Sequence, residues 1–196
     1  MTASSALLSL ARHAAIKLAQ DTGRRIAAVL PRARGEWRGA LTARAEGRGW
    51  RVANGAADPC RLYVSEVGLE YAFGNDFWSD GGSIPRPVQG AKHLRLKPDS
   101  FPRAYFLHDF LYARATAHVR EPGGKWVQVP VTRLEADTLL YCGLVAEGAT
   151  ALEARLIFRA VRLFGEKAWK AHRKAAEPRQ VQKSPPKRKK RRSHVH

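Results

Sequence analysis

Residues 100–116 read SFPRAYFLHDFLYARAT, and their pattern is typical of a helix with one apolar and one polar side. Ser100 is a reasonable N-cap and proline is tolerated in a first turn, so the sequence predicts a helix from near Ser100 to about Thr116. Leu107 and Leu111 mark the side of this helix that faces the core. The opposite side carries polar residues, which indicates a site at the edge of a hydrophobic core.

The polar face of this helix brings together Tyr105, His108, Asp109 and Tyr112. Side chains three and four residues apart are neighbours on a helix, so the four project in one direction. A histidine beside an aspartate is common in helices and by itself indicates no chemistry. A partner for this pair on the next predicted helix would be stronger evidence of a function.

A second helix is predicted for residues 132–148, where Thr132-Arg133-Leu134-Glu135 has the capping-box pattern. Asp137 is the only charged member of the apolar stripe on this helix. Burying an unpaired carboxylate costs several kcal/mol, so a cation or strong donor should face it, and His108 and Arg133 are both candidates. A short connection makes the two helices antiparallel neighbours, which brings Asp137 towards His108.

The flanking residues predict an α+β fold in which helices predominate. Residues 61–74 alternate between polar and apolar around Gly68, which indicates a short antiparallel pair. Residues 117–131 predict a hairpin between the two site helices. A third helix is predicted from Thr150 to about Trp169, again after a capping-box pattern.

Charge divides the chain into three segments. The net charge is +18, but residues 1–50 hold nine Lys and Arg against three acids, and residues 170–196 hold eleven against one. Residues 1–54 are therefore interpreted as a basic helix, ending before Pro31, followed by an Arg/Gly-rich linker. Residues 55–170 form the globular domain, and residues 171–196 form a disordered basic tail.

Several classes of protein are disfavoured by composition. Two cysteines, Cys60 and Cys142, make no disulfide framework and have no metal-ligand spacing, so two separate buried thiols are expected. No apolar run approaches the roughly 20 residues that span a bilayer. Residues 4–30 lack the pattern of a secretory signal. Their amphipathic helix could lie on an anionic membrane or pack against the domain or a partner.

The polar residues suggest a specific chemistry. A carboxylate behind an imidazole fixes its tautomer, so Asp137 could prepare His108 to accept a proton. Asp109 points to an adjacent sector and could bind a hard cation. Asp80 and the carbonyl groups of Gly81 and Gly82 could add the oxygen ligands that Ca²⁺ prefers. The alternative is that the Asp–His or Asp–Arg pair is purely structural and that no reaction takes place.

Three blocks of sequence resemble a known family. They are Asp80-Gly81-Gly82-Ser83-Ile84-Pro85-Arg86, then Leu107-His108-Asp109-Phe110-Leu111-Tyr112, then Arg133-x-Glu135-Ala136-Asp137. Their order and spacing resemble the phage- and prophage-associated proteins catalogued as domain of unknown function 1353. The resemblance extends through Val161-Arg162-Leu163-Phe164-Gly165 to Trp169 and implies a phage or prophage origin. It implies location in the bacterial cytoplasm or the virion, and no settled activity.

The layout of the site is also similar to that of phospholipase A2. His-Asp-x-x-Tyr on one helix, a hairpin and an Asp on the next helix follow the same order. The resemblance implies that His108 is the general base, Asp109 a Ca²⁺ ligand, Asp137 the carboxylate that orients the histidine, and Tyr112 its hydrogen-bonding neighbour. The disulfides of that family are absent, and the loop at residues 80–85 would have to replace its calcium loop.

Three functions follow from these observations. The first is a Ca²⁺-dependent phospholipase or esterase that acts on a phospholipid or anionic membrane surface. The second is a non-enzymatic phage tail or assembly component, bound to phage structural proteins, in which the polar cluster is structural. The third, binding of nucleic acid, is restricted to non-specific contact through the basic tail, because the globular segment is almost neutral.

Deletion of residues 174–196 should leave the thermal midpoint of unfolding nearly unchanged, because the segment has no apolar period. The same deletion should weaken binding to polyanions and flatten its salt dependence, since that binding depends on counterion release. Thermal melts and a salt titration with heparin would measure both effects. A large decrease in the midpoint would show that the tail packs on the domain.

Overall fold

The computed structural model describes residues 35–53, 59–65, 68–74, 77–81, 100–120, 124 and 126–176. The predicted N-terminal helix, Gly82 and the chain after residue 176 lie outside the described residues. In the part that is described, no helix has the length and apolar character needed to cross a bilayer. Cys60 and Cys142 are separate, buried free thiols, as expected.

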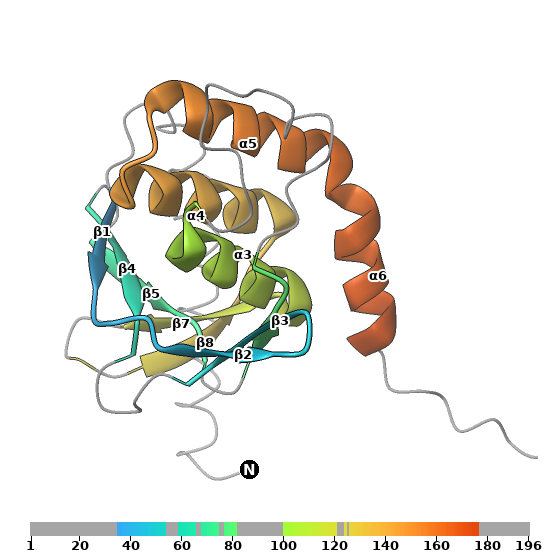
Figure 1. Ribbon diagram of the computed structural model, residues 1–196, viewed down its shortest axis with the longest axis horizontal. Coiled ribbons are helices and arrows are strands. Elements are labelled where there is room, and N and C mark those ends of the chain that lie inside the picture. Colours follow the sequence, from blue (N-terminus) through green and yellow to red (C-terminus); the bar gives the residue numbers. More distant parts are fainter. Residues whose placement is uncertain are drawn as a thin grey trace, which may run out of the picture.

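Two antiparallel sheets form one side of the molecule (Figure 1). A five-stranded sheet has the order β1-β4-β5-β7-β8, and a three-stranded sheet has the order β2-β3-β6. The strands are β1 Gly35–Arg38, β2 Ala43–Glu46, β3 Gly49–Val52, β4 Arg61–Val64, β5 Leu69–Ala72, β6 Trp78–Ser79, β7 Thr116–Arg120 and β8 Trp126–Pro130.

Both predicted strand pairs are confirmed. β4 pairs with β5, and the turn between them includes Gly68, whose φ of 67° a residue with a side chain rarely adopts. β7 and β8 form the hairpin that connects the two site helices. Alternate residues such as Leu62, Tyr71 and Val129 are buried in the main core, so one face of the larger sheet is covered.

The described residues form four helices: α3 Pro102–Arg114, α4 Arg133–Ala146, α5 Ala151–Phe164 and α6 Glu166–Ala176. α3 and α4 pack side by side between the sheet and α5, and α6 runs alongside α3 (Figure 1). Side chains on one side of α3 and α4 join the sheet core, and those on the other side join a second core with α5. α3 and α4 are therefore apolar around most of their circumference.

Groups from other helices satisfy both ends of α3. The N-cap is Phe101, without a side-chain hydrogen bond, so the predicted cap at Ser100 is wrong. Instead, the Glu147 carboxylate accepts hydrogen bonds from the backbone N–H groups of Arg103 and Ala104, both at 3.1 Å. At the other end, the Arg173 guanidinium donates to the carbonyl oxygens of residues 112 and 113. These are the groups that a helix cannot satisfy itself.

The linker predicted before residue 55 is wrong. Residues 35–52 form β1, β2 and β3, and β1 pairs with β4 through four residue pairs, so the folded part begins well before the predicted boundary. Trp37 explains why this segment belongs to the fold, since its indole N–H donates to the Gly143 carbonyl oxygen of α4 at 3.0 Å. Strands of four residues give too little alternation to be recognised within an Arg/Gly-rich composition.

The predicted third helix is two helices. α5 ends at Phe164 and α6 begins at Glu166, so helical structure continues past Trp169 to residue 176, into the segment predicted to be disordered. The break lies at Gly165. A β-carbon there would lie 2.6 Å from the Tyr112 hydroxyl oxygen and 2.5 Å from the Val161 carbonyl oxygen. Tyr112 therefore occupies the space that a side chain at this position would need.

Glu147→Ala should destabilise the protein by about 1–2 kcal/mol, because it removes the acceptor for two N–H groups of α3. Glu147→Gln keeps one acceptor and should cost less. Ser100→Ala is the matched control and should be nearly neutral, since the Ser100 side chain does not cap this helix. Urea denaturation would compare the three variants. An equal loss of stability in Ser100→Ala and Glu147→Ala would contradict this account of the helix N-terminus.

Candidate active site

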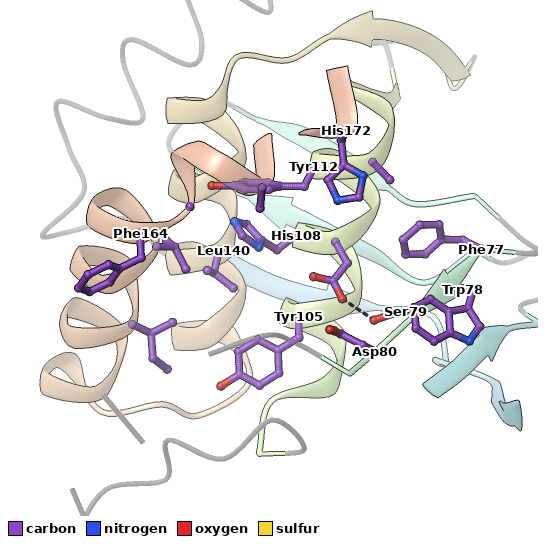
Figure 2. A pocket seen from close by; sticks show the side chains of 16 residues that line it. Phe77, Trp78, Ser79, Asp80, Tyr105, His108, Tyr112, Leu140, Phe164 and His172 are labelled. Carbon is purple, nitrogen blue, oxygen red and sulfur yellow. Dashed lines mark hydrogen bonds between the residues drawn. The ribbon is translucent and has the colours of Figure 1, made fainter. Parts of the chain in front are cut away.

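The polar face of α3 forms one wall of a pocket of about 460 Å³. Tyr105, His108, Asp109 and Tyr112 all line it, as their helical spacing predicts. Figure 2 shows His108 between an apolar wall with Leu140 and Phe164 and a second wall with Phe77 and Trp78. The volume lies within the range of small-molecule sites. A group that reacts with His108 would therefore lie among mainly apolar side chains.

Asp137 lies directly behind this wall and has no solvent exposure. One carboxylate oxygen lies 2.9 Å from His108 Nε2 and accepts a hydrogen bond from the Tyr112 hydroxyl at 2.7 Å. The other oxygen accepts from Arg162 Nη1 at 2.7 Å and lies 3.5 Å from Arg133 Nε. Both cationic candidates named from the sequence therefore approach Asp137, and a third, Arg162, joins them.

These contacts keep Asp137 ionised despite its burial. Burial alone would raise the pKa of this carboxyl group, but the hydrogen bond and charge of His108, together with hydrogen bonds from Tyr112 and Arg162, lower it below its ordinary value. Burial and the charge of Asp137 raise the pKa of the Tyr112 hydroxyl, which remains a protonated donor. Asp137 is therefore a fixed negative charge in the interior.

The contact with Asp137 determines which nitrogen of His108 is available for chemistry. An ionised carboxylate only accepts hydrogen bonds, so Nε2 of the neutral ring carries the proton and donates it to Asp137. The lone pair then resides on Nδ1. Because His108 lines the pocket, a water molecule there could give a proton to Nδ1. The imidazolium that results would be stabilised by Asp137.

Asp109 faces a different partner. Its carboxylate accepts a hydrogen bond of 2.5 Å from the Ser79 hydroxyl on β6, and the same Ser79 oxygen accepts from the Gly81 backbone N–H at 3.0 Å. Burial raises the pKa of Asp109 to about 7. Hydrogen bonding from Ser79 and the charge of His108 act to lower it, whereas repulsion by the Asp80 carboxylate and a hydrogen bond that protonated Asp109 donates to Asp80 add to the increase. Both the protonated and the ionised form of Asp109 are therefore populated near neutral pH.

A Ca²⁺ ion at this site would have to be held by the carboxylates of Asp80 and Asp109. Asp80 and Asp109 both line the pocket and interact with each other, and oxygen ligands suit a hard cation. Gly81 is next to them, with a φ of 86°, whereas Gly82 lies outside the described residues. Within the described ranges, no group of three or more His, Cys, Asp or Glu could hold a metal ion. The two carboxylates would need backbone, hydroxyl or water oxygens to complete a Ca²⁺ site.

Three residues around the site were not predicted from the sequence. Ser79 belongs to β6, a strand of two residues that pairs with β3. So short a strand leaves no alternation of polar and apolar residues that could be recognised in the sequence. Arg162 lies one turn before the break after α5, and its charge is typical of an exposed helical face. His172 on α6 also lines the pocket, but lies in the segment interpreted as a tail. Only Arg162 was within a sequence block already singled out.

The chain was compared with protein-family models, curated proteins and solved structures, and none of them matches it.

Asp137→Ala should destabilise the protein by about 3–5 kcal/mol, because it leaves buried donors and cations unpaired. Asp137→Asn keeps the shape and should cost less. The folded pKa of Asp137 is lowered, so its ionic contribution is present above the unfolded value of about 3.9 and is lost as the pH falls through the folded value. The difference in unfolding free energy between wild type and Asp137→Asn should therefore be constant above about pH 5 and should shrink as the pH is lowered from there towards the folded pKa. Chemical denaturation on both sides of that pH measures it, and a difference that stays constant as the pH falls would contradict the assignment.

Proposed function

We propose that this protein is a hydrolase that uses His108 to activate water and cleaves a carboxylic ester of a phospholipid or a related lipid, with Ca²⁺ as cofactor. The observation that carries the proposal is the 2.9 Å contact between His108 Nε2 and a fully buried, ionised Asp137 at the wall of a pocket. A histidine held in this way has its basic nitrogen free for a proton from water.

The walls of the pocket favour an apolar substrate. Leu140, Ile157 and Val161 contribute a continuous aliphatic wall on the helical side, and Phe77 and Trp78 stand opposite. Ser79, Asp80 and Asp109 form a polar group that interacts within the same lining. A lipid ester matches this combination, since its acyl chain is apolar and its ester and head group are polar.

The proposed hydrolysis has two steps, in which His108 first accepts a proton and then returns it. His108 Nδ1 takes a proton from water while the water oxygen forms a bond to the ester carbonyl carbon. Asp137 holds the ring in place and stabilises its positive charge, and the Tyr112 hydroxyl donates to the same Asp137 oxygen and so positions the carboxylate. The ester C–O bond then breaks, and His108 returns its proton to the departing alkoxide. Bound at Asp80 and Asp109, Ca²⁺ would supply positive charge for the oxygen of the polarised carbonyl.

The second candidate is a phage structural component in which the cluster only holds helices together. The observation that favours it is the number of partners of Asp137, because Tyr112, Arg133 and Arg162 would join three helices even without turnover. The resemblance to the phage-associated family agrees with either function. In both cases we propose that the protein originates from a phage or prophage and acts in the bacterial host or the virion.

Hydrolysis of phospholipid vesicles should require Ca²⁺ and should fall by roughly 10²–10⁴-fold in His108→Ala, because the general base is lost. His118→Ala is the matched control, since His118 lies on β7 and does not line the pocket. Fatty-acid release from anionic vesicles, with Ca²⁺ or with a chelator, measures the rate. A folded wild-type protein that neither binds Ca²⁺ nor releases fatty acid would establish the structural alternative.

A further inference from the structure

A second cavity, of about 340 Å³, adjoins the candidate active site. Its lining consists of Leu41, Ala43, Trp50, Asp80, Gly81, Pro102 and Phe106. All but one of these residues are uncharged, and the exception, Asp80, also lines the active-site pocket. Asp80 therefore stands where two largely apolar cavities meet.

The geometry of α3 explains why the two cavities are separate. Successive residues on a helix point about 100° apart, given 3.6 residues per turn. Tyr105 and Asp109 face the active-site pocket, whereas Pro102 and Phe106 face the second cavity. The two cavities thus use adjacent sectors of the same helix, and Asp80 lines both of them.

Exposed aromatic side chains line both cavities. Trp50 lines the second cavity and is 44% exposed, and Trp78 lines the active-site pocket and is 43% exposed. Phe164 also lines the active-site pocket and is 53% exposed. Large exposed apolar groups that line cavities indicate contact with an apolar ligand or surface.

We propose that the ligand is an amphiphile with two acyl chains, one seated in each cavity, and that its polar part lies between them at Asp80. The choice of a lipid rests on the proposed hydrolase function, whereas the requirement for two chains rests on the paired cavities. A polar centre flanked by two apolar compartments matches a diacyl lipid better than a lipid with a single chain. The chain beside His108 would carry the ester that is cleaved.

Binding can be measured without hydrolysis. The probes are ether-linked phosphatidylcholines with short chains brominated near their ends, used below the critical micelle concentration. One probe has two chains and the other has one, and neither contains an ester. Bromine quenches nearby tryptophan fluorescence, so Trp50→Phe and Trp78→Phe identify which cavity each chain enters. Trp126→Phe on β8 is the matched control, because Trp126 lines neither cavity.

The two-chain probe should quench both Trp50 and Trp78, so each variant should lose part of the quenching while Trp126→Phe keeps all of it. The one-chain probe should bind at least tenfold more weakly. Ala43→Phe fills the second cavity and should remove the tenfold preference, while affinity for the one-chain probe stays within about twofold. That unchanged affinity also shows that the variant is folded.

Equal affinity for the two probes, or quenching by the two-chain probe that does not involve Trp50, would overturn the proposal. Two-chain binding and the proposed hydrolysis can be tested independently of each other. Quenching of both tryptophans by a protein that releases no fatty acid would support two-chain binding and reject the hydrolase. Hydrolysis that depends on His108, with no preference for two chains, would support the hydrolase and reject this inference.

Discussion

The structure depends on one buried negative charge. Asp137 is completely inaccessible to solvent, and such a charge is tolerated only when donors and cations surround it. His108 and Tyr112 come from α3, Arg133 from its own helix, and Arg162 from α5. The relative positions of three helices are thus constrained by the need to neutralise a single carboxylate. A rotation of α4 would break several contacts at once.

The same constraint connects stability to chemistry on α3. This helix is held at its N-terminus by the Glu147 carboxylate and at its C-terminus by the Arg173 guanidinium. A negative group at the first end and a positive group at the last both complement the helix dipole. His108 lies between these two anchors. Its position is therefore set by interactions outside the pocket, which leaves the pocket side free for a ligand.

The centre of the site could be predicted from the sequence because the patterns that mark it are local. Helical periodicity placed His108, Asp109 and Tyr112 on one face, and the charge on an apolar stripe marked Asp137 as a residue that needs a partner. Arg162 could not be assigned, because the rotation of α5 against α4 depends on packing between distant residues. Trp37 was missed for a similar reason: its partner, the Gly143 carbonyl, is 106 residues away.

The break between α5 and α6 defines a local pattern that distant relatives can be searched for. Arg162 must reach Asp137, residue 165 must lack a side chain beside Tyr112, and Trp169 packs edge-on against the Tyr112 ring at 5.1 Å. Arg-x-x-Gly-x-x-x-Trp therefore encodes the rear support of the site within eight consecutive positions. Proteins that share it downstream of a His-Asp-x-x-Tyr helix would be expected to share this arrangement, even where their loops, charged termini and strand sequences have diverged.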